Sequence, residues 1–138
     1  MFTVPKVNKK LIQYNYGINF LALAPNITVT GSISIEADAD FRARKTTYQA
    51  DVVGLAQAES TRVIPLCTFQ ITDTATARNL SNIQIPVTSY FGTGERPFIL
   101  PVPRIYRANS VLSFSVTNVS QATTYNLRLV LIGEKLML

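Results

Sequence analysis

The stretch NITVTGSISIEADADFRARKT (residues 26–46) alternates between apolar and polar residues for almost its whole length. From residue 27 to residue 44 its odd positions carry apolar residues or glycine, and its even positions carry Thr, Ser, Glu, Asp or Arg. Successive side chains of a β-strand point to opposite faces, so this period of two predicts a long strand with one buried and one solvated face. Gly31 predicts a bulge or interruption within it.

Shorter segments of the same character follow along the chain, separated by polar turns. We expect strands at residues 18–24, 62–72, 82–88, 98–106, 111–119 and 124–133. Residues 45–62 are less clear and fit either a weak strand at YQADVV or a loop with a helical turn. Several short strands at a spacing of about 8–12 residues are typical of β-sandwiches and barrels. The prediction is one all-β domain, a single antiparallel β-sandwich of jelly-roll type.

The first residues differ from the rest in lacking a clear period. Pro5 disfavours a helix, and Asn15 and Gly17 mark breaks, so we expect an N-terminal arm and first short strand over residues 1–24 and a sandwich body over 25–138. About twenty extended residues reach at most about 70 Å. Two interpretations stay open: a frayed terminus, or an arm that orders against a neighbouring subunit by strand addition or swapping.

Composition narrows the possible functions. The 138 residues include no histidine and one cysteine, Cys67, which excludes Ser-His-Asp and Cys-His catalysis, histidine-ligated zinc and an internal disulfide. Cys67 lies in a strand-like run and is expected to be a buried, inert thiol. We expect no cofactor and no metal. No apolar run is long enough to cross a bilayer, and no signal peptide is recognised, so synthesis in a cytoplasm is expected.

The net charge of +5 comes from scattered basic residues. Because they do not interleave with glycine and aromatic residues, the pattern argues against nucleic-acid binding and suits an acidic protein surface equally well. Arg96, Arg104 and Arg107 surround a proline-rich segment, where they either contact an acidic partner or protect an edge strand from aggregation.

Glu36, Asp38 and Asp40 form a row of acids on the polar face of the long alternating stretch. Residues two apart on a strand are about 6.5–7 Å apart, which matches the carboxylate spacing of inverting glycosidases but also fits any such pair on any strand. The glycine and distal Glu of an EF-hand loop are absent, although calcium stays open as an alternative. We interpret the row as the solvated or cross-strand-paired face of a strand.

The loop YFGTGERPF (residues 90–98) resembles a phosphate-binding loop only at first sight. It lacks the Lys-Ser/Thr pair and the following helix of a P-loop, and Gly92 and Gly94 are better interpreted as turn residues. Tyr90 and Phe91 fit either an exposed contact patch or the core.

The sequence from about Gly31 to Leu138 resembles small β-sandwich virion accessory proteins of tailed bacteriophages. The resemblance rests on Asp40-Phe41, on LSN at residues 80–82, on two glycines followed by Pro97, and on the terminal L-x-L-x-G-x-K at residues 129–135. It implies a non-enzymatic capsid decoration or cement protein, or another minor head component, that bridges neighbouring subunits of the shell.

The expected partners are the major capsid protein or other virion proteins, with a homo-oligomer, no membrane and no small-molecule substrate. The expected location is the virion, after synthesis in the host bacterial cytoplasm. The candidate partner-binding residues are Lys6, Lys9, Lys10, Leu11, Ile12, Tyr14, Tyr16, Tyr90, Phe91 and Arg96.

Other functions stay open. The chain fits a neck or tail structural protein as well as a head protein. A carbohydrate-binding β-sandwich module is a further alternative, although the absence of tryptophan counts against it. Two further alternatives are a hydrolase that uses Glu36, Asp38 or Asp40, and a protein that packs nucleic acid through its basic arm.

Overall fold

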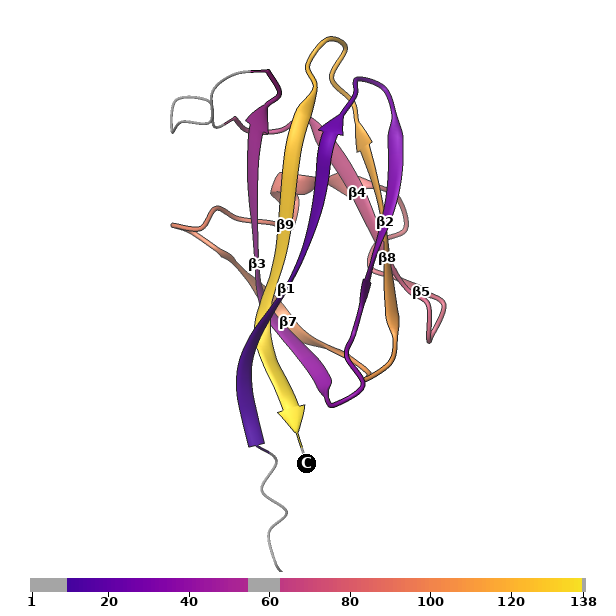
Figure 1. Ribbon diagram of the computed structural model, residues 1–138, viewed down its shortest axis with the longest axis vertical. Helices are drawn as coiled ribbons and strands as arrows, with labels where there is room; N and C mark the ends of the chain where they lie inside the picture. The colour runs from indigo at the N-terminus through magenta and orange to yellow at the C-terminus, as the bar shows by residue number, and fades with distance from the viewer. Residues whose placement is uncertain (1–9, 55–62, 138) are drawn as a thin grey trace, which may run out of the picture.

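The structure, a computed structural model, describes residues 10–54 and 63–137, and within them the fold is a sandwich of two antiparallel sheets. Figure 1 shows the two layers, with β1, β9 and β3 in one and β2, β8 and β4 in the other. The strands are β1 (Lys10–Leu23), β2 (Thr28–Ser34), β3 (Asp40–Val52), β4 (Cys67–Asp73), β5 (Arg78–Asn79), β6 (Ile85–Pro86), β7 (Phe98–Tyr106), β8 (Val111–Asn118) and β9 (Tyr125–Met137), with a 3₁₀ turn at Val87–Ser89.

The strand order is that of a jelly roll. Sheet A has the order β1-β9-β3-β7, and sheet B has the order β2-β8-β4-β5, with β6 also paired to β4. The pairings are nested along the chain, as in one long antiparallel ribbon: β1 pairs with β9, β2 with β8, β3 with β7, and β4 with β5 and β6. Wrapping that ribbon so that successive pairs fall into alternate sheets produces the jelly roll, and the predicted fold class is confirmed.

The stretch at residues 26–46 is two strands rather than the single long strand that its alternation predicts. β2 ends at Ser34 in sheet B and β3 begins at Asp40 in sheet A, so the chain changes sheets across residues 35–39. The alternation hides this change because Ile35 and Ala39, within the connection, are both buried. Backbone hydrogen bonds between Ile35 and the β7–β8 turn fix the crossing.

Gly31 does not mark a bulge. β2 pairs with β8 in unbroken register, with Gly31 opposite Phe114. A Cβ at Gly31 would lie 2.9 Å from Ile18 Cδ1 and 3.2 Å from Phe20 Cε1. The missing side chain therefore lets β1 of one sheet pack closely on β2 of the other.

The N-terminal prediction is corrected where the structure describes the chain. Lys10–Leu23 is one 14-residue strand that pairs with β9 along its length, apart from an irregularity between Phe20 and Leu23. The boundary expected at residue 24 is therefore not seen, because Tyr16, Phe20 and Leu23 point into the core and make this strand part of the body. Residues 1–9 of the expected arm lie outside the described residues.

The core lies between the two sheets and is rich in aromatic rings. Phe41, Phe69 and Phe114 are fully buried, and the Tyr16 and Phe41 rings meet edge to face at 4.8 Å between centroids. The alternation of buried residues along β8 and β9 agrees with the period of two expected for these strands. Residues 45–52 of the less clear segment also belong to a strand, β3.

The edge strand β7 leaves its ladder in the middle. Its pairing with β3 jumps from Arg104 opposite Ala43 to Ile99 opposite Lys45, so residues 100–103 bulge out of the sheet. Pro101 and Pro103 lie in this bulge and have no N–H to donate to a ladder. The sequence expectation that this segment lies at a sheet edge is confirmed.

Candidate functional site

The acid row is divided between a turn and a strand, and two of its members hold a buried lysine. Lys135 on β9 is 5% exposed, and its Nζ lies 2.8 Å from Glu36 Oε2 and 3.1 Å from Asp38 Oδ1. The same ammonium group lies 4.2 Å from the centroid of the Tyr14 ring. We call Tyr14, Glu36, Asp38 and Lys135 the lysine cluster.

The cluster ties three distant parts of the chain together. Tyr14 Oη donates to Glu36 Oε1 at 2.7 Å, and the backbone N–H of Glu36 donates to Tyr16 Oη at 3.0 Å. Strand β1, the turn at residues 35–39 and strand β9 are therefore joined through one glutamate. Asp40 acts separately, because its Oδ1 accepts from the backbone N–H of Ala108 at 2.9 Å.

Electrostatics explain why the cluster is stable. Hydrogen bonding from Lys135 and from Tyr14 lowers the pKa of Glu36 below its ordinary value, and hydrogen bonding to Glu36 and then to Asp38 raises the pKa of Lys135 in spite of its burial. The Tyr14 pKa is raised because its hydroxyl donates to Glu36. All three groups keep their charge state around neutral pH, so none is set up for proton transfer there.

The interpretation of the acids as a paired face is confirmed for Glu36 and Asp38, although they lie in a turn and not on a strand. Within residues 10–54 and 63–137, no group of three or more Asp, Glu or Cys residues is placed to hold a metal ion. On the opposite, outer face of sheet A, Glu134 accepts from Arg42 Nε at 2.7 Å and from Arg44 Nε at 2.6 Å. Although burial favours the neutral acid, these two guanidinium groups lower the pKa of Glu134.

The candidate partner-binding residues divide into core and surface. Tyr16, Tyr90 and Phe91 are buried, so their prediction as contact residues is wrong. Their apolar rings serve the core instead: Phe91 packs edge to face on Phe69 at 5.0 Å between centroids. Tyr14 is half-buried in the lysine cluster. The exposed candidates are Lys10, Leu11, Ile12 and Arg96, while Lys6 and Lys9 lie outside the described residues.

The loop before β7 is a structural turn, as its sequence predicts. A Cβ at Gly92 would lie 2.2 Å from the carbonyl oxygen of Arg96 and 2.5 Å from the backbone nitrogen of Phe98. Gly92 also exchanges backbone hydrogen bonds with Thr46 and Tyr48 of β3, at 3.1 and 2.7 Å. The glycine lets the loop close tightly on itself and dock on sheet A.

Cys67 is buried between the sheets, as predicted, and is 2% exposed. Burial raises the pKa of its thiol to about 11, so the thiolate is scarce at neutral pH. The hydroxyl of Tyr90 is buried without a hydrogen-bond partner among the described residues.

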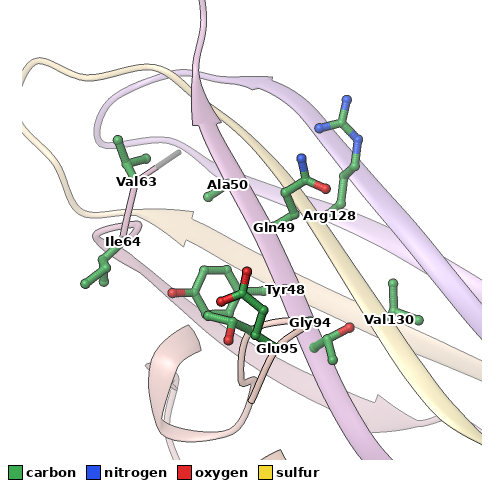
Figure 2. A pocket seen from close by; sticks show the side chains of 11 residues that line it. Tyr48, Gln49, Ala50, Val63, Ile64, Gly94, Glu95, Arg128 and Val130 are labelled. Carbon is green, nitrogen blue, oxygen red and sulfur yellow. The ribbon is translucent and has the colours of Figure 1, made fainter. Parts of the chain in front are cut away.

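One cleft that the sequence did not indicate lies on the outer face of sheet A (Figure 2). Its volume is about 490 Å³, and its lining comes from β3, β9, the segment at residues 63–64 and the loop at residues 93–95. Arg128 borders it and is oriented by Asp51, whose Oδ2 lies 3.4 Å from the Arg128 Nη1. Of the described lining residues, Glu95 is the only carboxylate.

Exposed apolar side chains gather on β7. Ile99, Val102 and Ile105 are 68%, 74% and 56% exposed, and we call them the β7 patch. Arg96 and Arg107 are exposed beside it in sequence, and Arg104 is half-exposed within β7. The proline bulge carries Val102 outward, which the sequence pattern alone did not reveal.

No helix within the described part of the chain is long and apolar enough to cross a membrane. Comparison with known proteins finds no matching protein family, no matching curated protein and no matching solved structure.

Proposed function

We propose that the chain is a non-enzymatic structural protein of a phage virion, a capsid decoration or cement protein that stabilises the shell by bridging neighbouring subunits. The observation that carries this proposal is the β7 patch. Three large aliphatic side chains on one strand edge, each more than half exposed, are typical of a protein–protein contact surface. The jelly-roll fold is compatible with this role but hosts many others, so it supports the proposal only weakly.

The chemistry around the patch favours a partner of a particular kind. Because Pro101 and Pro103 have no N–H to donate, β7 does not offer a continuous row of hydrogen bonds to a partner strand. The partner therefore packs against the side chains of β7 instead of extending the sheet. The neighbouring arginines and the net charge of +5 suit an apolar surface with an acidic rim. An outer surface of the major capsid protein with that character is the partner we propose.

The state of the acids supports a role without catalysis. Glu36 and Asp38 form ion pairs with Lys135, and Glu134 forms ion pairs with Arg42 and Arg44, so these carboxylates are engaged in holding the sandwich together. A hydrolase would require one of them to be free in a partly desolvated pocket.

Binding to shells tests the proposal. Purified protein is mixed with phage shells that lack it, and the bound fraction is measured after sedimentation. We expect Val102→Asp to reduce binding at least tenfold, because a charge replaces the most exposed residue of the patch. Ile83→Asp, an exposed site on another part of the surface, is the matched control and should bind like the wild type. Equal binding by both variants would count against the β7 patch as the docking surface.

A second candidate function has its own observation. The outer face of sheet B carries hydroxyl and amide side chains without charge, including Thr30 and Ser32 of β2, Ser113 and Ser115 of β8, and Gln70 of β4. Such groups hydrogen-bond sugars, which favours a carbohydrate-binding module as the alternative. A glycan-array screen with a saturable signal, lost in a Gln70→Ala, Ser115→Ala variant, would support it.

A further inference from the structure

One side of the sandwich is built from an uncharged part of the chain. Residues 11–35 contain no Asp, Glu, Lys or Arg, although charged residues make up 15% of the chain. These residues form β1 and β2, which are the edge strands of sheets A and B respectively. The two edges lie on the same side of the sandwich, where β1 packs on β2 (Figure 1). We call this the uncharged side.

Apolar side chains are exposed along the uncharged side. Val29 shows the effect most clearly: it pairs with Val116 and points inward with it, yet it is 38% exposed whereas Val116 is fully buried. The difference arises because β2 has no neighbouring strand beyond it in the described sheet. Further exposed aliphatic residues on this side are Leu11, Ile12, Leu21 and Ile27.

The opposite side of the sandwich is protected in the ways that sheet edges usually are. There β7 carries two prolines, a bulge and Arg104, and β5 and β6 are only two residues long. Natural proteins use prolines, bulges, charges and short strands to prevent edge-to-edge pairing. In contrast, β1 is 14 residues long and contains no proline. Its one charged residue, Lys10, stands at its start, and its one irregularity lies near its end. An edge left open in this way fits a partner strand.

We propose that the uncharged side is a docking surface for a second copy of this chain, with the two β1 edges paired antiparallel about a twofold axis. This pairing joins the two A sheets into one continuous sheet and places two β1 strands, which carry no charged residue after Lys10, against each other. It also sends the two Lys10 side chains to opposite ends of the interface, so they do not repel each other. A twofold interface closes on itself and stops at a dimer, as isologous interfaces do.

The available area is sufficient for a stable dimer. A strand of 14 residues extends about 45 Å at about 3.4 Å per residue. The side of a sandwich is about 20 Å wide, since two sheets about 10 Å apart carry side chains on both outer faces. The side therefore offers about 900 Å² per partner, close to the ~800 Å² of a standard protein–protein interface.

Sedimentation equilibrium of the purified full-length chain tests the proposal. The expected result is a monomer–dimer equilibrium for the wild type. Asn15→Lys places a charge on an exposed position near the middle of β1, where the two copies meet, and should weaken dimerisation at least tenfold. Val102→Lys puts the same charge on the exposed edge of β7 and should leave the dimer intact. Circular dichroism verifies that both variants remain folded.

Hydrogen exchange provides a second measurement that does not depend on a substitution. Amides of β1 should become more protected as the protein concentration rises through the dimer range, while amides of β7 should not change. A wild-type monomer at all concentrations, an open-ended aggregate, or equal dissociation of both lysine variants would overturn the proposal. The inference is compatible with the proposed bridging role but rests on separate residues. A monomeric protein that still binds shells would therefore overturn only the proposed dimer. A dimeric protein that does not bind shells would overturn only the proposed role in the shell.

Discussion

Lys135 shows at the residue scale how a fold can accommodate a charged group in a nearly buried position. Its ammonium group is surrounded by two carboxylates and a tyrosine ring, so burial is compensated by ion pairing, hydrogen bonding and a cation–π contact. Sequence analysis identified the acids but could not identify their partner, which lies 97 or more positions away along the chain.

The lysine cluster makes stability depend on pH. The pKa of Glu36 is lower in the folded protein than its ordinary 4.5, so its stabilising effect is present above about pH 4.5 and is lost as the pH falls through the folded-state pKa. The pKa of Lys135 is above its ordinary 10.5, so its effect is complete below about pH 10.5 and is lost at higher pH. We therefore expect the highest Tm between roughly pH 5 and 10.

Thermal melts of Glu36→Gln against pH test this origin. The variant should melt at a lower temperature than the wild type at pH 7, and the difference should shrink toward pH 3. Since about half of the Glu36 side chain is exposed, the effect is modest. Glu95→Gln, on an exposed loop, is the control and should follow the wild-type curve. A difference between Glu36→Gln and wild type that is the same at pH 3 and pH 7 would rule out the ion pair as its cause.

Gly133 is a second residue with a testable role. It lies in β9 next to the irregularity in β3, and a Cβ there would lie 1.9 Å from the carbonyl oxygen of Arg42. Gly133→Ala should therefore force β3 and β9 apart and lower the free energy of unfolding by about 2–4 kcal/mol. Gly94→Ala, where nothing lies within 4 Å, should change it by less than about 0.5 kcal/mol. Urea denaturation measures both values, and comparable losses would contradict this role of Gly133.

At the element scale, strand β1 separates what the sequence could predict from what it could not. Its inward residues Tyr16, Phe20 and Leu23 are all buried, but their spacing is broken by the irregularity before Leu23, which hides the period of two. Asn15 and Gly17, which suggested breaks, occupy ordinary paired positions opposite Ile132 and Val130. Tertiary pairing with β9 overrides these local signals.

The crossing from β2 to β3 shows the complementary error. Alternation in sequence continues through residues 35–39 because Ile35, Ala37 and Ala39 are all apolar, although only Ile35 and Ala39 are buried. It carries no information on which sheet a strand joins. That information comes from long-range pairing, such as β2 with β8 and β3 with β9.

Two truncations distinguish β1 from the residues before it. Deleting residues 1–9 should leave the sandwich folded, because β1 and the lysine cluster remain. Deleting residues 1–17 removes Tyr14 and Tyr16, the Tyr16–Phe41 ring contact and two thirds of the β1–β9 ladder, and should lower the Tm by at least about 10 °C or prevent folding. Circular dichroism melts of both proteins provide the comparison. A fully stable 1–17 deletion would show that residues 10–17 of β1 are dispensable.

At the scale of the whole molecule, the composition and the strand spacing predicted a single jelly-roll sandwich, and the nested ladders confirm it. The surfaces were harder to predict. The β7 patch depends on a bulge that is visible only once β7 is aligned with β3, and the uncharged side depends on β1 and β2 being edges of different sheets. The aromatic candidates Tyr90 and Phe91 were misplaced because a single sequence does not show which residues flanking a strand turn inward.

The proposed shell contact and the proposed dimer contact use opposite sides of the sandwich. The β7 patch and its arginines lie on one side of the sandwich, and the uncharged side lies on the other, because β7 and β1 are the opposite edges of sheet A. A chain that contacts a shell through one side and a second copy through the other would bridge neighbouring positions, and repeated weak contacts would add to its effect on the particle.

Quantitative mass spectrometry of purified phage particles from cells that express this chain tests the proposed role most directly, by counting its copies against those of the major capsid protein. A copy number comparable to that of the shell protein is the expected result. A handful of copies would favour the neck or tail, and absence of the chain from purified particles would contradict a structural role in the virion.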